Sequence, residues 1–146
     1  MSKAFADRLS QLQGVECESV DVVECEAPAT DALYSVGTSM RFGDATRLSA
    51  QFWRLIRDGK PQVSIFDHRQ RYGLPAPIDA VQVLRNEILG KRVIEASMSE
   101  TTGDLRFAFA GDLLFEVFNF TAFEIWDVTF ADGTREFSNY ALAIRG

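Results

Sequence analysis

Two stretches of the chain carry apolar residues at helical spacing, and each stretch ends at a glycine. In the first stretch, the apolar stripe and its glycine are Phe5, Leu9, Leu12 and Gly14. In the second stretch, they are Val81, Leu84, Ile88 and Gly90. Residues at i, i+3 or i+4, and i+7 share one face of a helix, and glycine commonly ends a helix. The pattern therefore predicts helices over residues 3–13 and 79–90, the second capped by Asp79.

The rest of the chain alternates apolar and polar residues over short runs, which is typical of half-buried strands. In the first half, the predicted strands cover residues 15–24, 32–36, 39–43, 48–57 and 60–66. In the second half, they cover residues 91–99, 104–110, 112–120, 123–131 and 134–140. The apolar parity changes after Ser19, which predicts a bulge or a bend in the first strand. Asp58 and Gly59 predict a type I′ hairpin turn.

The two halves repeat these features in the same order. The spacing from Asp31 to Trp53 equals the spacing from Asp104 to Trp126, and an Asp-Gly pair follows each tryptophan. Between these markers, four apolar residues of the first half align with four of the second half. In chain order, Tyr34, Val36, Met40 and Phe42 align with Phe107, Phe109, Leu113 and Phe115. We therefore predict an α+β fold of two tandem units, each a helix plus an antiparallel meander.

The two predicted units span about residues 1–74 and about residues 75–146, and together they form one compact domain over residues 1–146. The fold then has two helices and a mostly antiparallel sheet. The sequence leaves open whether the two meanders join in one sheet or stack as a sandwich.

The net charge of the 146-residue chain is -6 at pH 7. Binding to phosphate groups needs clusters of lysine and arginine, so this charge argues against nucleic acid or an anionic membrane as the main partner. Every apolar stretch is shorter than the roughly 18 residues that a membrane helix requires. The first residues lack the apolar core of a secretion signal, so we expect a cytoplasmic protein.

Acidic residues concentrate between positions 16 and 26, where lysine and arginine are absent. They are Glu16, Glu18, Asp21, Glu24 and Glu26. One hypothesis is an electrostatic patch that binds a basic protein partner. The alternative is a solvated edge strand whose charges prevent edge-to-edge aggregation. Cys17 and Cys25 lie within this segment, on either side of seven residues of the predicted strand. We expect both to be reduced thiols, because an extended chain holds them too far apart to bridge.

The single histidine, His68, suggests two kinds of site. A general base at His68 would need orientation by Asp67, but neighbouring residues of a strand point to opposite faces, so an exposed polar strand end is favoured. The other hypothesis is a pocket between the two repeat units. His68, Arg69 and Arg71 would line that pocket and favour an anionic ligand.

Three carboxylates, Glu116, Glu124 and Asp127, surround the aromatic run from Phe115 to Trp126. Paired carboxylates are able to carry out acid–base chemistry, but on strands they usually form the solvated face of a sheet. Charge beside large aromatic residues also suits a binding surface. The sequence contains no phosphate-binding glycine loop, metal-ligand cluster or dinucleotide fingerprint, so we predict no catalytic residue, no metal and no cofactor.

A longer pattern in the second half supports a resemblance. It consists of Ile88 to Val93, the segment from Gly103 to Trp126 with its aromatic-Glu-x-Trp strand, and the Asp132-Gly133 turn. This pattern resembles a loose group of small bacterial proteins, many of them uncharacterised, some of which look like immunity proteins beside polymorphic toxins. The resemblance implies a hairpin-rich fold and carries over no catalytic residue.

These observations together predict a non-catalytic, cytosolic bacterial protein that binds a protein partner. The expected form is an immunity-type protein that neutralises a basic toxin by occlusion, with the acidic segment as its contact face. The alternative is a small-ligand-binding protein or an enzyme with a pocket between the units. A third hypothesis is a homodimer that pairs exposed sheet edges.

Overall fold

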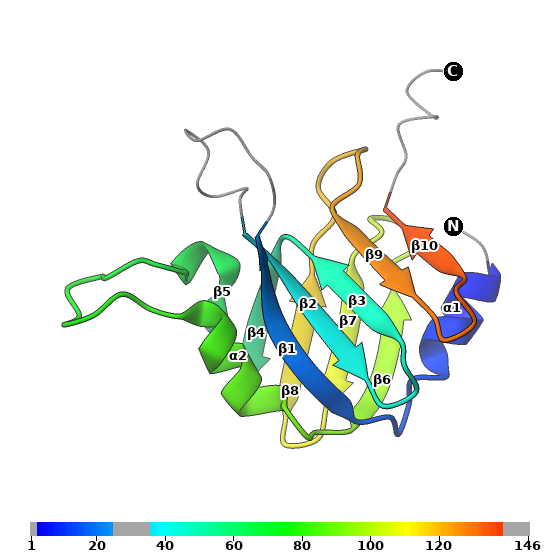
Figure 1. The fold of residues 1–146 in the computed structure, drawn as a ribbon, viewed down its shortest axis with the longest axis horizontal. Helices are drawn as coiled ribbons and strands as arrows, with labels where there is room; N and C mark the ends of the chain where they lie inside the picture. The colour runs from blue at the N-terminus through cyan, green and yellow to red at the C-terminus, as the bar shows by residue number, and fades with distance from the viewer. Residues whose placement is uncertain (1–2, 25–35, 139–146) are drawn as a thin grey trace.

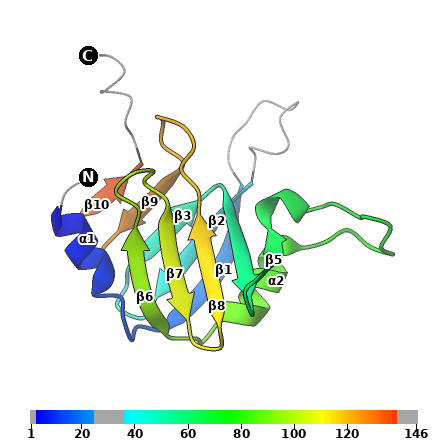
Figure 2. The ribbon, with the colours of Figure 1, turned by 180° about the vertical axis from the view of Figure 1, so that it is seen from behind.

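The computed structural model describes residues 3–24 and 36–138, which form two facing antiparallel sheets with a helix at each end (Figure 1, Figure 2). The predicted α+β class is confirmed. The first half contributes α1 (Lys3–Ser10), β1 (Cys17–Glu24), β2 (Val36–Phe42), β3 (Arg47–Ala50), β4 (Trp53–Arg57), β5 (Lys60–Ser64) and the short 3-10 helix η2 (Ile65–Asp67). The second half contributes α2 (Ala80–Ile88), β6 (Val93–Met98), β7 (Leu105–Phe109), β8 (Leu113–Val117), β9 (Trp126–Thr129) and β10 (Arg135–Phe137).

Each sheet combines strands from both halves. The strand order is β1-β2-β3-β9-β10 in the first sheet and β5-β4-β8-β7-β6 in the second. Each half therefore builds a meander of three strands and then sends its last two strands to the opposite sheet. The prediction of a five-strand meander was wrong on this point, and so was the single strand over residues 48–57.

The predicted long strand divides at residues 51–52 into β3 and β4, which belong to different sheets. Phe52 and Trp53 are adjacent and both are buried, with exposed fractions of 2% and 0%. Adjacent side chains of a regular strand point to opposite faces. A break in the strand lets both aromatic side chains enter the core between the sheets.

The junctions between helix and strand pair with each other at the edge of the sandwich where β1 and β6 begin (Figure 1). The N–H of Gly14 donates to the carbonyl of Val93 at 2.7 Å, and the N–H of Gly90 donates to the carbonyl of Cys17 at 2.9 Å. The separation in sequence between the two donors, Gly14 and Gly90, equals the separation between the two acceptors, Cys17 and Val93. Each hydrogen bond is therefore the counterpart of the other. The two halves are therefore related by an approximate twofold rotation. The sequence boundary near residues 74 and 75 stays a prediction.

The first two strands of each half share a detail of register. The β1–β2 ladder shifts between Cys17 and Ser19, and the β6–β7 ladder shifts between Val93 and Glu95. The bulge predicted near Ser19 is therefore confirmed, and the second half has its counterpart.

These registers correct the sequence alignment of the repeat. Phe42 pairs with Cys17, and Phe109 pairs with Val93, so Phe42 and Phe109 are counterparts. The predicted match of Phe42 with Phe115 was wrong by one strand. The physical reason is the difference in loop length, because the connection from β1 to β2 is longer than the connection from β6 to β7. Asp31 and Tyr34 lie outside the described residues.

The two helices cover opposite ends of the sandwich, and each packs mainly on strands of the other half (Figure 1). Helix α1 lies against β6, and the ring of Phe5 stacks on Trp126 with centroids 5.7 Å apart. Helix α2 lies against β1 and β5. Both predicted apolar stripes are buried, and their side chains join the tryptophans and phenylalanines of the strands in one hydrophobic core. No helix in residues 3–24 and 36–138 is long and apolar enough to cross a membrane.

Candidate functional site

Aromatic side chains are exposed at one end of the sandwich, where the chain crosses from β8 to β9. The crossover loop covers residues 118–125 and carries Phe120 and Phe123, with exposed fractions of 60% and 57%. Phe66 of η2 is 45% exposed. The ring of Phe52 lies 4.6 Å from that of Phe120 and 5.7 Å from that of Phe66, so it joins the loop to η2. We call Phe66, Phe120 and Phe123 the aromatic end.

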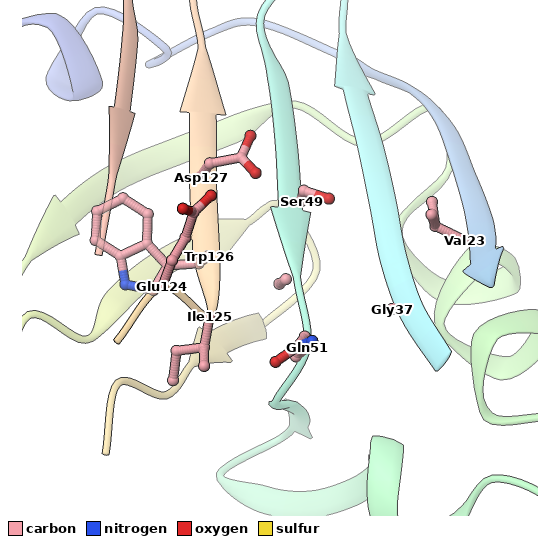
Figure 3. Close-up of a pocket in the computed structure, with 9 residues that line it drawn as sticks. Val23, Gly37, Ser49, Gln51, Glu124, Ile125, Trp126 and Asp127 are labelled. Carbon is pink, nitrogen blue, oxygen red and sulfur yellow. The ribbon is translucent and has the colours of Figure 1, made fainter. Parts of the chain in front are cut away.

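A depression of about 290 Å³ lies next to this loop, on the outer face of the sheet that contains β9 (Figure 3). Its lining includes Ser49, Gln51, Glu124, Ile125 and Asp127, together with Val23 and Gly37 of β1 and β2. Gly37 and Ser49 have small side chains or none, so the sheet surface is hollow between the larger lining residues. We call this feature the acidic depression, because Glu124 and Asp127 both stand in its lining.

One arginine joins the two carboxylates of the acidic depression. The Nη2 atom of Arg135 lies 3.1 Å from Oε1 of Glu124 and 3.3 Å from Oδ2 of Asp127. The other oxygen of each carboxylate makes no hydrogen bond or ion pair in the described part of the chain. The pair therefore binds one guanidinium group and keeps acceptor capacity for another cation.

A buried hydroxyl holds the backbone of the acidic depression in place. Ser138 is 0% exposed, and its Oγ accepts hydrogen bonds from the N–H groups of Ile125 and Trp126 at 2.9 and 3.0 Å. The indole N–H of Trp126 donates to the carbonyl of Gly103 at 3.0 Å. The chain that presents Glu124 and Asp127 is thus fixed from the core side. The sequence alone gave no indication of this role for Ser138, because a lone serine in a predicted strand gives no signal of burial.

The acidic segment is largely paired with arginines where the structure describes it. Glu18 Oε2 lies 3.4 Å from Arg41 Nη2, and Asp21 Oδ1 lies 3.7 Å from Arg85 Nη2. Glu16 is exposed near the approximate twofold. Glu24 ends β1, its side chain is outside the described part, and Glu26 lies outside the described residues. The patch hypothesis stays a prediction, and the arginines weaken the field on which it depends.

The edge of β1 is covered over part of its length, which bears on the alternative of a solvated edge strand. Arg85 Nε donates to the carbonyl of Val20 at 2.8 Å, and the N–H of Cys17 donates to the carbonyl of Lys91 at 2.9 Å. Helix α2 and the residues that follow it therefore satisfy outward backbone groups of β1. Both contacts lie in the first half of β1, so the solvated edge strand stays a prediction.

His68 acts as a structural acceptor at the start of α2. Its Nδ1 accepts a hydrogen bond from the N–H of Ala80 at 3.1 Å, which requires a neutral imidazole. Burial lowers the pKa of His68 because it removes water from the charged form. The carboxylate of Asp67 instead accepts hydrogen bonds from Ser64 N–H and Tyr72 Oη. The structure does not form a dyad between Asp67 and His68.

Arg69 and Arg71 are exposed on the segment that joins the two halves. This segment, residues 68–78, leaves the sandwich between η2 and α2 and projects away from both sheets (Figure 1, Figure 2). We call it the connector arm. The depressions of about 290, 130 and 390 Å³ found in the described ranges have other linings. The predicted pocket at His68, Arg69 and Arg71 stays a prediction that this placement does not favour.

The three carboxylates of the second half do not form one group. Glu116 lies on β8 in the opposite sheet, where its Oε1 accepts a hydrogen bond from Arg54 Nε at 2.9 Å. Only Glu124 and Asp127 come together. The sequence placed these two beside large aromatic side chains, and the structure puts Phe123 in the same loop. The binding-surface interpretation of this segment therefore gains a defined geometry.

Groups that hold a metal ion or act as nucleophiles are not assembled in the part that the structure describes. That part contains no cluster of three or more His, Cys, Asp or Glu side chains suited to a metal ion. Burial raises the pKa of the Cys17 thiol to about 12, so the thiol stays protonated. Cys25 lies outside the described residues. A scan against protein-family models, a search of curated proteins and a search of solved structures each found no match to the chain.

Proposed function

We propose that this protein is a non-catalytic module that binds a protein partner through its aromatic end and the neighbouring acidic depression. The observation that carries the proposal is the exposure of Phe66, Phe120 and Phe123 by 45%, 60% and 57% at one end of the molecule. Clustered exposed aromatic side chains are typical of protein interfaces, where they supply most of the binding energy.

The partner that this surface suits is basic. Glu124 and Asp127 share one arginine, so the surface around them keeps a net negative charge. Carboxylates at the rim of an apolar patch speed the association with a basic partner and select its orientation. The immunity-type function, in which the partner is a cytosolic toxin with a basic cleft, is the form that the sequence resemblance favours. Occlusion of that cleft needs no chemistry from this chain.

A ligand pocket between the two halves has less support. Large side chains fill the space between the sheets, and those fully buried include Trp53, Trp126, Phe42, Phe107 and Phe115. A protein with a central ligand site keeps a cavity there.

The test compares the tagged wild-type protein with a Phe120→Ser, Phe123→Ser double variant in capture from native lysate, followed by titration with the purified partner. We expect one stoichiometric, basic partner, and a loss of affinity on the order of a hundredfold in the double variant. The matched control is Ile94→Ser, because Ile94 is also exposed, by 54%, but lies on β6. Equal binding by all three proteins would contradict the proposal.

The acidic segment requires a separate comparison. Charge reversal at Glu16, Glu18, Glu24 and Glu26 lowers both the affinity and its salt dependence if this segment is part of the contact face. If binding and its salt dependence do not change, the segment is not part of the interface. The aromatic end is then tested by its own variants alone.

A further inference from the structure

The connector arm has an ordered internal structure although it projects from the sandwich. The N–H of Arg69 donates to the carbonyl of Ile78, and the N–H of Ile78 donates to the carbonyl of Gln70, both at 2.8 Å. The hydroxyl of Tyr72 donates to Asp67 Oδ1 at 3.0 Å. These hydrogen bonds tie the tip back to the base of the arm. The arm is therefore preorganised, which lowers the entropy cost of binding.

The tip of the arm exposes apolar side chains under backbone strain. Tyr72 is 67% exposed and Leu74 is 50% exposed. The φ of Tyr72 is 44°, in the left-handed region that costs a bulky residue free energy. Strain of this kind persists where the surrounding structure enforces it and clusters at functional sites.

The arm carries two arginines between the flanking residues Asp67 and Asp79. Residues 68–78 include Arg69 and Arg71 and no acidic residue, whereas the chain as a whole has a net charge of -6. The arm therefore complements a surface that combines carboxylates with apolar side chains. The acidic depression of this chain has that composition, because Glu124 and Asp127 line it together with Ile125 and Val23.

We propose that the connector arm docks into the acidic depression of a second copy of this chain. The depression holds about 290 Å³, near the lower limit for ligand pockets, which suits one or two side chains of a protein. The carboxylates already bind the guanidinium of Arg135, so their geometry suits a second arginine on the incoming arm. Exchange of two arms about a twofold axis repeats the same contact and doubles the buried surface.

This self-association goes beyond partner binding and uses the same acidic depression, so a docked arm and a bound partner exclude each other there. The purified chain alone tests the self-association. Sedimentation velocity and light scattering on the full chain, from about 1 to about 500 µM, measure the mass against the 16.3 kDa of one copy. We expect a concentration-dependent rise toward twice that mass. The Tyr72→Ser, Leu74→Ser double variant raises the dissociation constant on the order of tenfold or more.

Charge reversal identifies the two surfaces. An Arg69→Glu, Arg71→Glu variant and a Glu124→Lys, Asp127→Lys variant each stay monomeric, and mixing the two restores a dimer because the charges complement each other again. The matched control is Arg106→Glu, an exposed arginine on β7, which leaves the dimer intact. A wild-type protein that is monomeric over the whole range overturns the proposal. So does a dimer that the arm variants do not weaken, or a failure of the mixed variants to associate while circular dichroism shows both folded.

Discussion

The two crossovers between the sheets occupy equivalent places in the fold, yet they differ in length and in what they expose. The first crossover is residues 51–52, and its Phe52 is 2% exposed. The second is residues 118–125, and its Phe120 and Phe123 are 60% and 57% exposed. Each crossover leads directly to a buried tryptophan. The comparison teaches that both halves keep the buried tryptophan, while the loop before it differs in length and in the side chains that it exposes.

The two tryptophans satisfy the same requirement with different acceptors. The indole N–H of Trp53 donates to the side-chain hydroxyl of Thr38 at 2.8 Å. The indole N–H of Trp126 donates to the backbone carbonyl of Gly103 at 3.0 Å. A buried indole N–H needs an acceptor, but the fold does not specify which atom supplies it. The first half therefore depends on a side chain where the second half depends on the backbone.

The largest expected effect comes from truncation of either tryptophan. We expect Trp53→Ala and Trp126→Ala each to lower the free energy of unfolding by about 3–5 kcal/mol, because each removes a fully buried aromatic side chain. Urea denaturation followed by circular dichroism measures both. If one variant loses less than about 1 kcal/mol, the two halves do not contribute equally to the core.

The next largest effect on stability tests the side-chain acceptor of the Trp53 indole N–H. Thr38→Val leaves the indole N–H of Trp53 buried without an acceptor, and we expect a loss of about 1–3 kcal/mol in the free energy of unfolding. Thr38→Ser is the control, since it keeps the hydroxyl and should recover most of that stability. Equal stability of the Val and Ser variants would show that the hydrogen bond contributes little.

A smaller effect on stability distinguishes two turns of the same sheet, one from each half of the chain. In the turn after β2, Ala45 has a φ of 72°, and in the turn after β9, Gly133 has a φ of 86°. In both turns an aspartate accepts a hydrogen bond from the threonine N–H two residues later, Asp44 from Thr46 and Asp132 from Thr134. The turns therefore differ mainly in having alanine or glycine at the left-handed position.

We expect Gly133→Ala to destabilise the fold by about 1 kcal/mol, because an L side chain is strained at this φ. No atom lies within 4 Å of a Cβ added at Gly133, so the loss reports the backbone alone. Ala45→Gly should stabilise by about 0.5 kcal/mol, since it relieves the same strain at the cost of chain entropy. Thermal denaturation at one pH measures the change in melting temperature of each variant. A change of the same sign in both variants would contradict this account.

The smallest effect is a pH dependence that belongs to the start of α2. The pKa of His68 in the folded state is lowered by burial, so the folded state binds fewer protons than the unfolded state. Its contribution to stability is complete above the unfolded pKa near 6.5 and is lost as the pH falls through the lower folded pKa. We expect wild-type stability to fall more between pH 7.5 and 5 than that of His68→Asn, whose amide oxygen also accepts from Ala80 N–H. If the stability of the wild-type protein and of His68→Asn falls equally with pH, protonation of His68 does not contribute to the pH dependence.

Local patterns predicted much of this architecture. The helical stripes at Phe5, Leu9 and Leu12 and at Val81, Leu84 and Ile88 are buried, as spacing alone indicated. The parity change at Ser19 located the bulge. Asp58 and Gly59 both have positive φ, as a type I′ turn requires. These features depend on residues close together in the sequence, so their physics is visible in a short window.

The candidate site was only partly predictable. Glu124 and Asp127 were identified beside aromatic residues, but Glu116 was grouped with them, although it lies in the other sheet. Phe66 was assigned to a strand, yet it lies in η2 and contacts Phe52. Arg135 and Ser138 gave no signal, because their roles arise only when β10 returns beside β9.

The sequence by itself determined the helices, most strands, the turns and the repetition of one unit. Only the tertiary structure decided that β3 pairs with β9 and β4 with β8, and therefore that each sheet contains strands of both halves. Alternation shows which face of a strand is apolar, but it does not specify the neighbouring strand, because any strand with a matching face satisfies the same local pattern. The choice depends on how two adjacent buried residues, Phe52 and Trp53, reach the same core. The aromatic end and the acidic depression lie where the chain crosses between the sheets, so both depend on that choice.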